Sequence, residues 1–160
     1  MVDELPLHGA TSADISALVD HRRRMFEDMA VARGRVYPVA DLDAMDAAYT
    51  LYLRSHLADG TLRAWVVEVA GQIVASGAVS FLTWPPRPDD LAERLALLHS
   101  VYTAPECRRR GLARRIVQTA IEACRAEGLR RLTLHASADG RSLYESLGFE
   151  PTNEMRLLLY

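Results

Sequence analysis

The chain has 160 residues, 49% of them hydrophobic and 25% charged, and this composition predicts a single domain over residues 1–160 with a buried core. Its 19 basic residues are all arginines, set against 21 acidic residues for a net charge of −2, and the lack of lysine excludes Schiff-base chemistry and a phosphate loop ending in Gly-Lys-Ser/Thr. No apolar run approaches the roughly 18 residues that cross a membrane, and the acidic start Met1–Leu5 lacks the basic residues of a signal peptide, so we expect a cytoplasmic protein with no membrane partner.

Two helices are expected first along the chain. Thr11 has the character of an N-cap, and Ile15 and Leu18 follow at helical spacing, which predicts a helix over residues 12–31. A proline and an aspartate then open a second helix, over residues 41–58, and an Asp-Gly pair closes it.

A hairpin, a loop and another strand follow. Residues 62–70 and 73–82 are rich in strand formers and are separated by a Gly-Gln turn, so they should pair as a hairpin. Residues 84–90 must form a loop, because three prolines within four positions block both ladders and helices. Residues 95–103 are predicted to form the next strand.

The last third of the chain alternates between helix and strand. Residues 109–127 have a strong apolar face at helical spacing, residues 129–136 alternate as a strand, residues 139–147 form a short helix, and residues 155–160 are expected to be a terminal strand. That strand could lie within the fold or between subunits of a homodimer. The order of elements indicates an α/β domain with a mixed sheet.

Basic residues concentrate where the strand 95–103 leads into the helix 109–127. Residues 104–160 hold ten arginines against seven acids, and five of the ten lie between Arg108 and Arg115. The first amides of a helix have no internal partner and favour an anion, and Gly111 and the small Ala113 allow a diphosphate to approach the backbone. A diphosphate-bearing cofactor fits this loop, although its spacing differs from the Gly-x-Gly-x-x-Gly dinucleotide fingerprint. The plainer interpretation is a solvated basic helix face.

These residues resemble the GNAT superfamily of acyl-CoA N-acyltransferases, and in particular its small bacterial members. Arg108-x-x-Gly111-x-Ala113 matches the family's Arg/Gln-x-x-Gly-x-Gly/Ala motif, and the segment 143–149 is similar to its Leu-Tyr-x-x-x-Gly-Phe signature. The resemblance covers residues 61–160. It implies a mixed, mostly antiparallel central sheet flanked by helices with splayed central strands, and acetyl-CoA (coenzyme A) as co-substrate with no metal.

The resemblance also implies which residues bind the cofactor. The backbone of Val101 and Thr103 would pair with the pantetheine arm, and the amides of residues 109–114 would bind the diphosphate. The chain departs from the family at Ser137, where asparagine is common, and at Gly140, where alanine is common. The expected cofactor-binding set is Val101, Tyr102, Thr103, Arg108, Arg109, Arg110, Gly111, Leu112, Ala113, Arg114, Ser137, Arg141 and Tyr144.

Two side chains are implied as catalytic. Tyr144 matches the family's usual general acid, since a phenol with a pKa near 10 can protonate the departing thiolate; otherwise it only packs behind the sulfur. His99 lies four residues before the end of its strand, where some family members have histidine, and is the candidate base, directly or through water. His135 and Ser137 are the neighbours that compete with it.

The acceptor is expected to be a small-molecule or peptide amine, attacked directly on the thioester in a ternary complex. Glu27, Asp28 or Glu154 could attract a cationic amine, and Tyr37 or Trp84 could stack on it.

Two alternative functions stay open. A nucleic-acid binder would need more basic residues and interleaved aromatics than the sequence has, so we expect no nucleic-acid partner. An inactive acyl-CoA-binding sensor would keep the Arg-Gly-Ala motif but need no acid.

Overall fold

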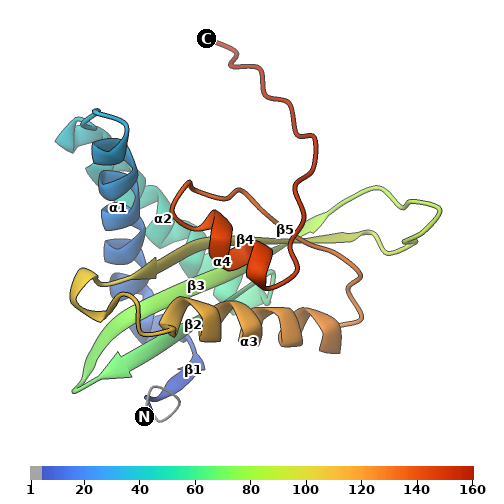
Figure 1. Cartoon of the computed structure of the whole chain (residues 1–160), viewed down its shortest axis with the longest axis horizontal. Helices are drawn as coiled ribbons and strands as arrows, with labels where there is room; N and C mark the ends of the chain where they lie inside the picture. Colours follow the sequence, from blue (N-terminus) through green and yellow to red (C-terminus); the bar gives the residue numbers. More distant parts are fainter. Residues whose placement is uncertain (1–4) are drawn as a thin grey trace.

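The architecture is a five-stranded sheet between helices (Figure 1). It is seen in a computed structural model that describes residues 5–160; residues 1–4, part of the expected domain and of its acidic start, lie outside the described residues. The strand order is β1 (Leu7–Gly9), β2 (Leu62–Val69), β3 (Gln72–Thr83), β4 (Arg94–Thr103) and β5 (Leu132–Leu134). All neighbours are antiparallel except β4 and β5, so the expected mixed, mostly antiparallel sheet is confirmed.

Helices cover both faces of the sheet, which is why β3 is buried without interruption from Val74 to Phe81. A short 3-10 turn, η2 (Ser12–Asp14), with a Thr11 capping box leads into α1 (Ile15–Ala32), and α2 (Val39–Asp59) follows. These two helices pack behind the sheet and α3 (Leu112–Ala126) packs in front of it (Figure 1).

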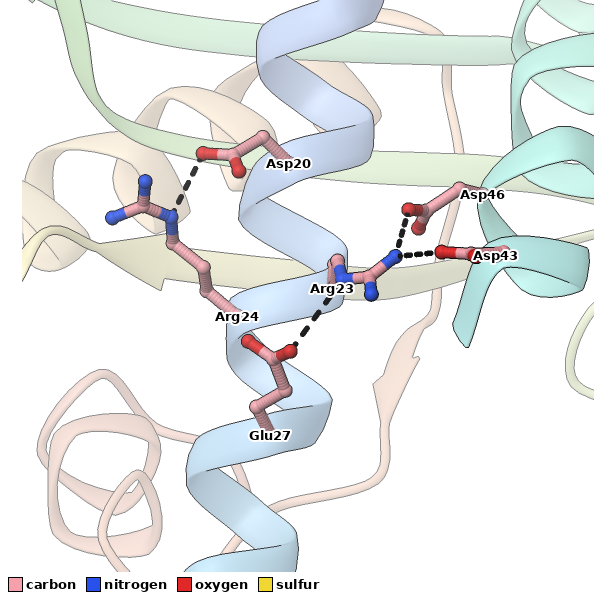
Figure 2. A network of polar contacts seen from close by, with 6 residues as sticks. All are labelled: Asp20, Arg23, Arg24, Glu27, Asp43 and Asp46. Atoms are coloured by element: carbon pink, nitrogen blue, oxygen red, sulfur yellow. Dashed lines mark hydrogen bonds and ion pairs between the residues drawn. The ribbon is translucent and has the colours of Figure 1, made fainter. Parts of the chain in front are cut away.

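A charged network fastens the two N-terminal helices together (Figure 2). Arg23 on α1 donates to Asp43 at 2.8 Å and to Asp46 at 2.7 Å, both on α2, and its Nε lies 3.4 Å from Glu27 one turn away. Arg24 pairs separately with Asp20 along α1. The α1–α2 pair therefore presents one fixed surface to the sheet.

The central strands separate at the point where the sequence resemblance implied a splay. β4 and β5 pair only from Ala96↔Leu132 to Leu98↔Leu134, so the second half of β4, residues 99–103, has no β5 partner. On its other edge, β4 bulges at Ser100 and Val101, because Ala78 pairs with His99 whereas Ser76 pairs with Tyr102.

Several boundaries differ from the sequence prediction. The predicted helix 109–127 begins only at Leu112, because Arg109 and Gly111 have positive φ and the chain first forms the turn η3 (Pro105–Cys107). The strand predicted over 129–136 is reduced to β5, and the short helix is α4 (Arg141–Ser146). The predicted terminal strand is wrong, since residues 155–160 form no strand and are exposed. β1 was missed because three residues carry no periodic signal.

Candidate active site

A row of backbone amides with no partner in residues 5–160 lies at the start of α3. Arg109 (φ 62°) and Gly111 (φ 76°) both have left-handed backbone, which bends the loop into a concave turn of the kind that binds anions. The first amide of α3 that donates a helical hydrogen bond is that of Arg115, which lies 3.1 Å from the Gly111 carbonyl oxygen. Among the described residues, no backbone carbonyl accepts from the amides of residues 109–114, which we call the amide cradle.

The arginines around the amide cradle have different tasks. Arg108 donates from Nε to the Thr103 carbonyl at 3.0 Å and from Nη2 to Asp28 at 2.5 Å, and this hydrogen bond holds the pKa of the Arg108 guanidinium above its usual range. Arg108 thus braces the loop against α1. Arg114 donates to Ser146 at 2.7 Å and so joins α3 to α4, while Arg109 and Arg110 are exposed beside the amide cradle.

The unpaired stretch of β4 leads to the amide cradle. Thr103 has a buried Oγ1 with no hydrogen-bond partner anywhere in residues 5–160, although buried hydroxyls are normally satisfied. The side chains of Tyr102 and Leu112 lie in the core, and the centroid of the Tyr102 ring is 4.8 Å from that of the His21 ring. Only the backbone of these two residues is therefore available to a ligand. The open β4 edge, the orphaned hydroxyl and the amide cradle fit an extended ligand that ends in phosphates.

A chain of polar side chains runs through the bulge of β4. Tyr52 is 2.8 Å from Ser80, Ser80 is 2.7 Å from His99 Nε2, and His99 Nδ1 is 2.9 Å from Ser100 Oγ. Burial, with a smaller contribution from the charge of Arg22, lowers the pKa of His99 to about 4. His99 is therefore neutral at pH 7, and both of its ring nitrogens are engaged.

Arg22 completes this chain from α1. It donates to Ser100 Oγ at 2.7 Å, and its guanidinium lies 5.1 Å from the Phe26 ring centroid and 4.6 Å from that of Tyr49. Within the described part of the chain, no carboxylate lies within 4 Å of the Arg22 guanidinium; the salt bridges there involve other arginines. Sequence reasoning missed Arg22 and Ser100, which are 78 residues apart and share no motif.

Tyr144 projects from α4 and packs against Phe149 at a centroid distance of 5.8 Å. Burial raises the pKa of its phenol, and its hydroxyl has no hydrogen-bond partner among residues 5–160. Ser137 accepts from the Gly140 amide at 3.2 Å and so holds the turn before α4, and Arg141 lies 3.4 Å from Glu145. The hydroxyl of Tyr144 is thus left available while its neighbours are engaged.

The acidic residues considered for a cationic acceptor are already paired. Glu27 lies beside Arg23, Asp28 holds Arg108, and Glu154 pairs with His135. His135 is thereby engaged outside the polar chain of His99.

Comparisons with known proteins agree with this geometry. Residues 21–149 match the acetyltransferase (GNAT) family. The uncharacterized N-acetyltransferase YjgM of Escherichia coli strain K12 is 31% identical over 143 residues, which cover 88% of this chain and 78% of that protein.

Two solved structures have similar folds over nearly their whole length. A predicted acetyltransferase from Clostridium acetobutylicum, solved with acetyl-CoA, superposes with a TM-score of 0.86 at 28% identity, covering 97% of this chain and 96% of that one. A GCN5-related N-acetyltransferase from Ralstonia eutropha JMP134 superposes with a TM-score of 0.87 at 26% identity, covering 97% of this chain and 98% of that one. The chain belongs to the GNAT family and is an acyl-CoA-dependent acetyltransferase.

Proposed function

We propose that the protein transfers an acetyl group from acetyl-CoA to a primary amine by direct attack in a ternary complex. The observation that supports this best is the alignment of the amide cradle with the unpaired edge of β4 and the orphaned Thr103 hydroxyl. The diphosphate lies on the amides of residues 109–114, the pantetheine arm follows β4 past Val101 and Thr103, and the exposed Arg109 and Arg110 add positive charge.

Side chains of the protein then donate and accept the protons that move during the reaction. The amine nitrogen attacks the thioester carbonyl near Val101, a new C–N bond forms, and the C–S bond breaks. Tyr144 gives its phenolic proton to the departing thiolate, and burial keeps this phenol protonated at neutral pH. The proton lost by the amine nitrogen passes through the Ser100 hydroxyl to Nδ1 of neutral His99, 2.9 Å away, and from there to solvent, while solvent returns a proton to the Tyr144 phenolate.

The acceptor side favours an amine that also has a negative group. Arg22 lies beside Ser100 with two aromatic rings against its guanidinium and no acidic partner in the described residues. A carboxylate on the acceptor would supply that partner with charge-assisted hydrogen bonds. We therefore place amino acids and small peptides ahead of polyamines among the acceptors.

We also propose a location and a domain organisation for the protein. Cys107 and Cys124 are free and buried, which suits a reducing cytoplasm. None of the helices in residues 5–160 combines the length and apolar character that a membrane-spanning segment needs. We propose one GNAT-type domain over residues 1–160.

An acyl-CoA-binding sensor without turnover is the competing proposal, since it would use the same amide cradle. Thiol release from acetyl-CoA with a panel of amines separates the two, and a thermal-shift titration with CoA reports binding alone. We expect both a CoA-dependent rise in Tm and amine-dependent thiol release. A rise in Tm without thiol release from any amine would favour the sensor, and neither response would overturn both proposals.

A further inference from the structure

The polar side chains around the β4 bulge form one unbroken row, which we call the polar chain. It begins at Ser100 on β4, continues through the His99 ring to Ser80 on β3, and ends at Tyr52 on α2. Its three links measure 2.9, 2.7 and 2.8 Å. Continuous donors and acceptors at these distances can pass a proton from one end of the row to the other.

The donors around Ser100 fix the direction of the polar chain. A serine hydroxyl has one hydrogen to donate and two lone pairs that accept. Arg22 can only donate, and it does so to Ser100 Oγ at 2.7 Å, while Tyr49 donates to the same oxygen at 3.4 Å. Both lone pairs are thereby occupied, so Ser100 donates its own hydrogen to His99 Nδ1.

The direction continues beyond the His99 ring. Burial keeps the pKa of His99 below its usual value, and a neutral imidazole that accepts at Nδ1 carries its hydrogen on Nε2. His99 Nε2 therefore donates to Ser80, and Ser80 donates to the Tyr52 hydroxyl. Tyr52 is half-buried and has no other hydrogen-bond partner in residues 5–160, so its own hydrogen is available to solvent.

We propose that Ser80 and Tyr52 form a proton exit that carries the proton of the acceptor amine from His99 to solvent at α2; this rests on the proposed acetyl transfer. The amine N–H replaces the long bond from Tyr49 to Ser100. Ser100 takes the amine proton and gives its own to His99 Nδ1. His99 gives its Nε2 proton to Ser80, and Ser80 gives its own to Tyr52, which releases one to water. One proton enters the polar chain and one leaves it.

An interior exit is needed because the two substrates close the site. Acetyl-CoA and the acceptor exclude the water that would otherwise take the amine proton, whereas the route through the polar chain stays open while they are bound. After product release, one proton enters at Tyr52 and one leaves from Ser100 to incoming water, which restores the starting direction. Ser80 and Tyr52 touch neither substrate, so both are positioning residues that act through His99.

Two substitutions of Tyr52 and an external base test the exit. Tyr52→Phe removes the last hydroxyl and keeps the ring, which lies beside the rings of Tyr49 and His56. We expect kcat to fall by roughly tenfold with an unchanged KM for the acceptor, less than the loss of about 10²–10⁴-fold for removing a general base, because His99 is still present. Tyr52→Ala should lower kcat as well and leave a space for imidazole.

Added imidazole separates proton transfer from packing. It should restore kcat of Tyr52→Ala as its concentration rises, and it should have no effect on Tyr52→Phe, in which the ring fills the space, or on wild type. Thr50→Val is the matched control, since it removes a hydroxyl of α2 that bonds to the Asp46 carbonyl outside the polar chain. Its kcat should equal that of wild type.

Nitrogen NMR of the His99 ring tests the direction of the polar chain without turnover, and does so even where Tyr52→Ala fails to fold. We expect a hydrogen on Nε2 and none on Nδ1, and the opposite tautomer would overturn the exit. Wild-type kcat in Tyr52→Phe, or a folded Tyr52→Ala that imidazole does not restore, would overturn the exit alone, since wild type still releases thiol. Absence of thiol release by wild type with every amine would overturn the proposed function together with the exit.

Discussion

Gly140 lies directly beneath the ring of Tyr144: a methyl group added at Gly140 would stand 2.9 Å from Tyr144 Cε2 and 3.2 Å from Ser137 Oγ. The absence of a side chain at this position is therefore what lets the Tyr144 ring sit where it does.

Gly140→Ala should displace the Tyr144 ring, because a Cβ at 2.9 Å forces the flexible ring to move. We expect a lower kcat for acetyl transfer with an unchanged Kd for CoA, since the amide cradle lies on another element. Ser142→Ala, on the exposed side of the same helix, is the control. Steady-state kinetics and calorimetric titration make the measurement; an unchanged kcat would show that the ring position has no part in the reaction.

Tyr144→Phe removes the phenolic hydroxyl and keeps the ring. A general acid typically contributes about 10²–10⁴-fold, so we expect kcat to fall within that range while CoA binding is retained. Burial raises the pKa of Tyr144, and the wild-type rate should therefore persist to alkaline pH before the phenol ionises. Full activity in the phenylalanine variant would leave Tyr144 with a packing role only.

His99 makes folding sensitive to acid. Its pKa of about 4 in the folded protein, set first by burial and then by Arg22, lies below the value near 6.5 in the unfolded chain, so the unfolded state binds more protons between these pH values. The free energy of unfolding should be fully retained above pH 6.5 and lost as the pH falls toward 4, by roughly 3 kcal/mol at most.

Urea titrations between pH 4 and 7 on wild type and His99→Gln check this. In the variant, the free energy of unfolding should depend less on pH than in wild type. Part of the dependence that remains comes from His21, whose pKa is also lowered by burial. An NMR titration in which the His99 ring protonates near pH 6.5 would contradict the assignment.

Arg22→Gln tests the acceptor class. A hydrogen bond to a charged group contributes about 1.5–3 kcal/mol, which corresponds to a KM raised by roughly 10- to 100-fold for acceptors with a carboxylate. Amines without one should be affected far less. Arg24→Gln is the control, because Arg24 pairs with Asp20 on the exposed side of α1. Equal effects on both classes of amine would remove Arg22 from acceptor recognition.

The parts of the fold that depend on local pattern were predictable from the sequence. α1, α2 and the β2–β3 hairpin follow from periodicity, caps and turn residues within a few positions of one another. The start of α3 was placed three residues early, because a left-handed Arg109 leaves no trace in apolar spacing. Residues 155–160 have the composition of a strand but no partner strand within their own described chain.

The site was predictable only where a contiguous motif marks it. The amide cradle lies within one short segment, and Tyr144 within another. The polar chain from Tyr52 through Ser80 and His99 joins residues from α2, β3 and β4, whose contact depends on the tertiary packing. The bulge that orients Ser100 depends on its pairing across β3.

Gly77 faces that bulge and should tolerate no side chain. A methyl group there would stand 2.7 Å from Ile116 Cγ2, in the buried core, and 3.3 Å from Val101 Cγ2. Overpacking of this kind costs about 1–3 kcal/mol, so Gly77→Ala should lower the free energy of unfolding by that amount in urea titrations. It should also weaken CoA binding, because the strain falls on Val101 at the proposed pantetheine edge. Gly9→Ala, where no atom lies within 4 Å of the added methyl, is the control and should change neither. Wild-type stability in Gly77→Ala would mean that the core relaxes around the bulge, and weakened CoA binding at unchanged stability would place the effect on β4 alone.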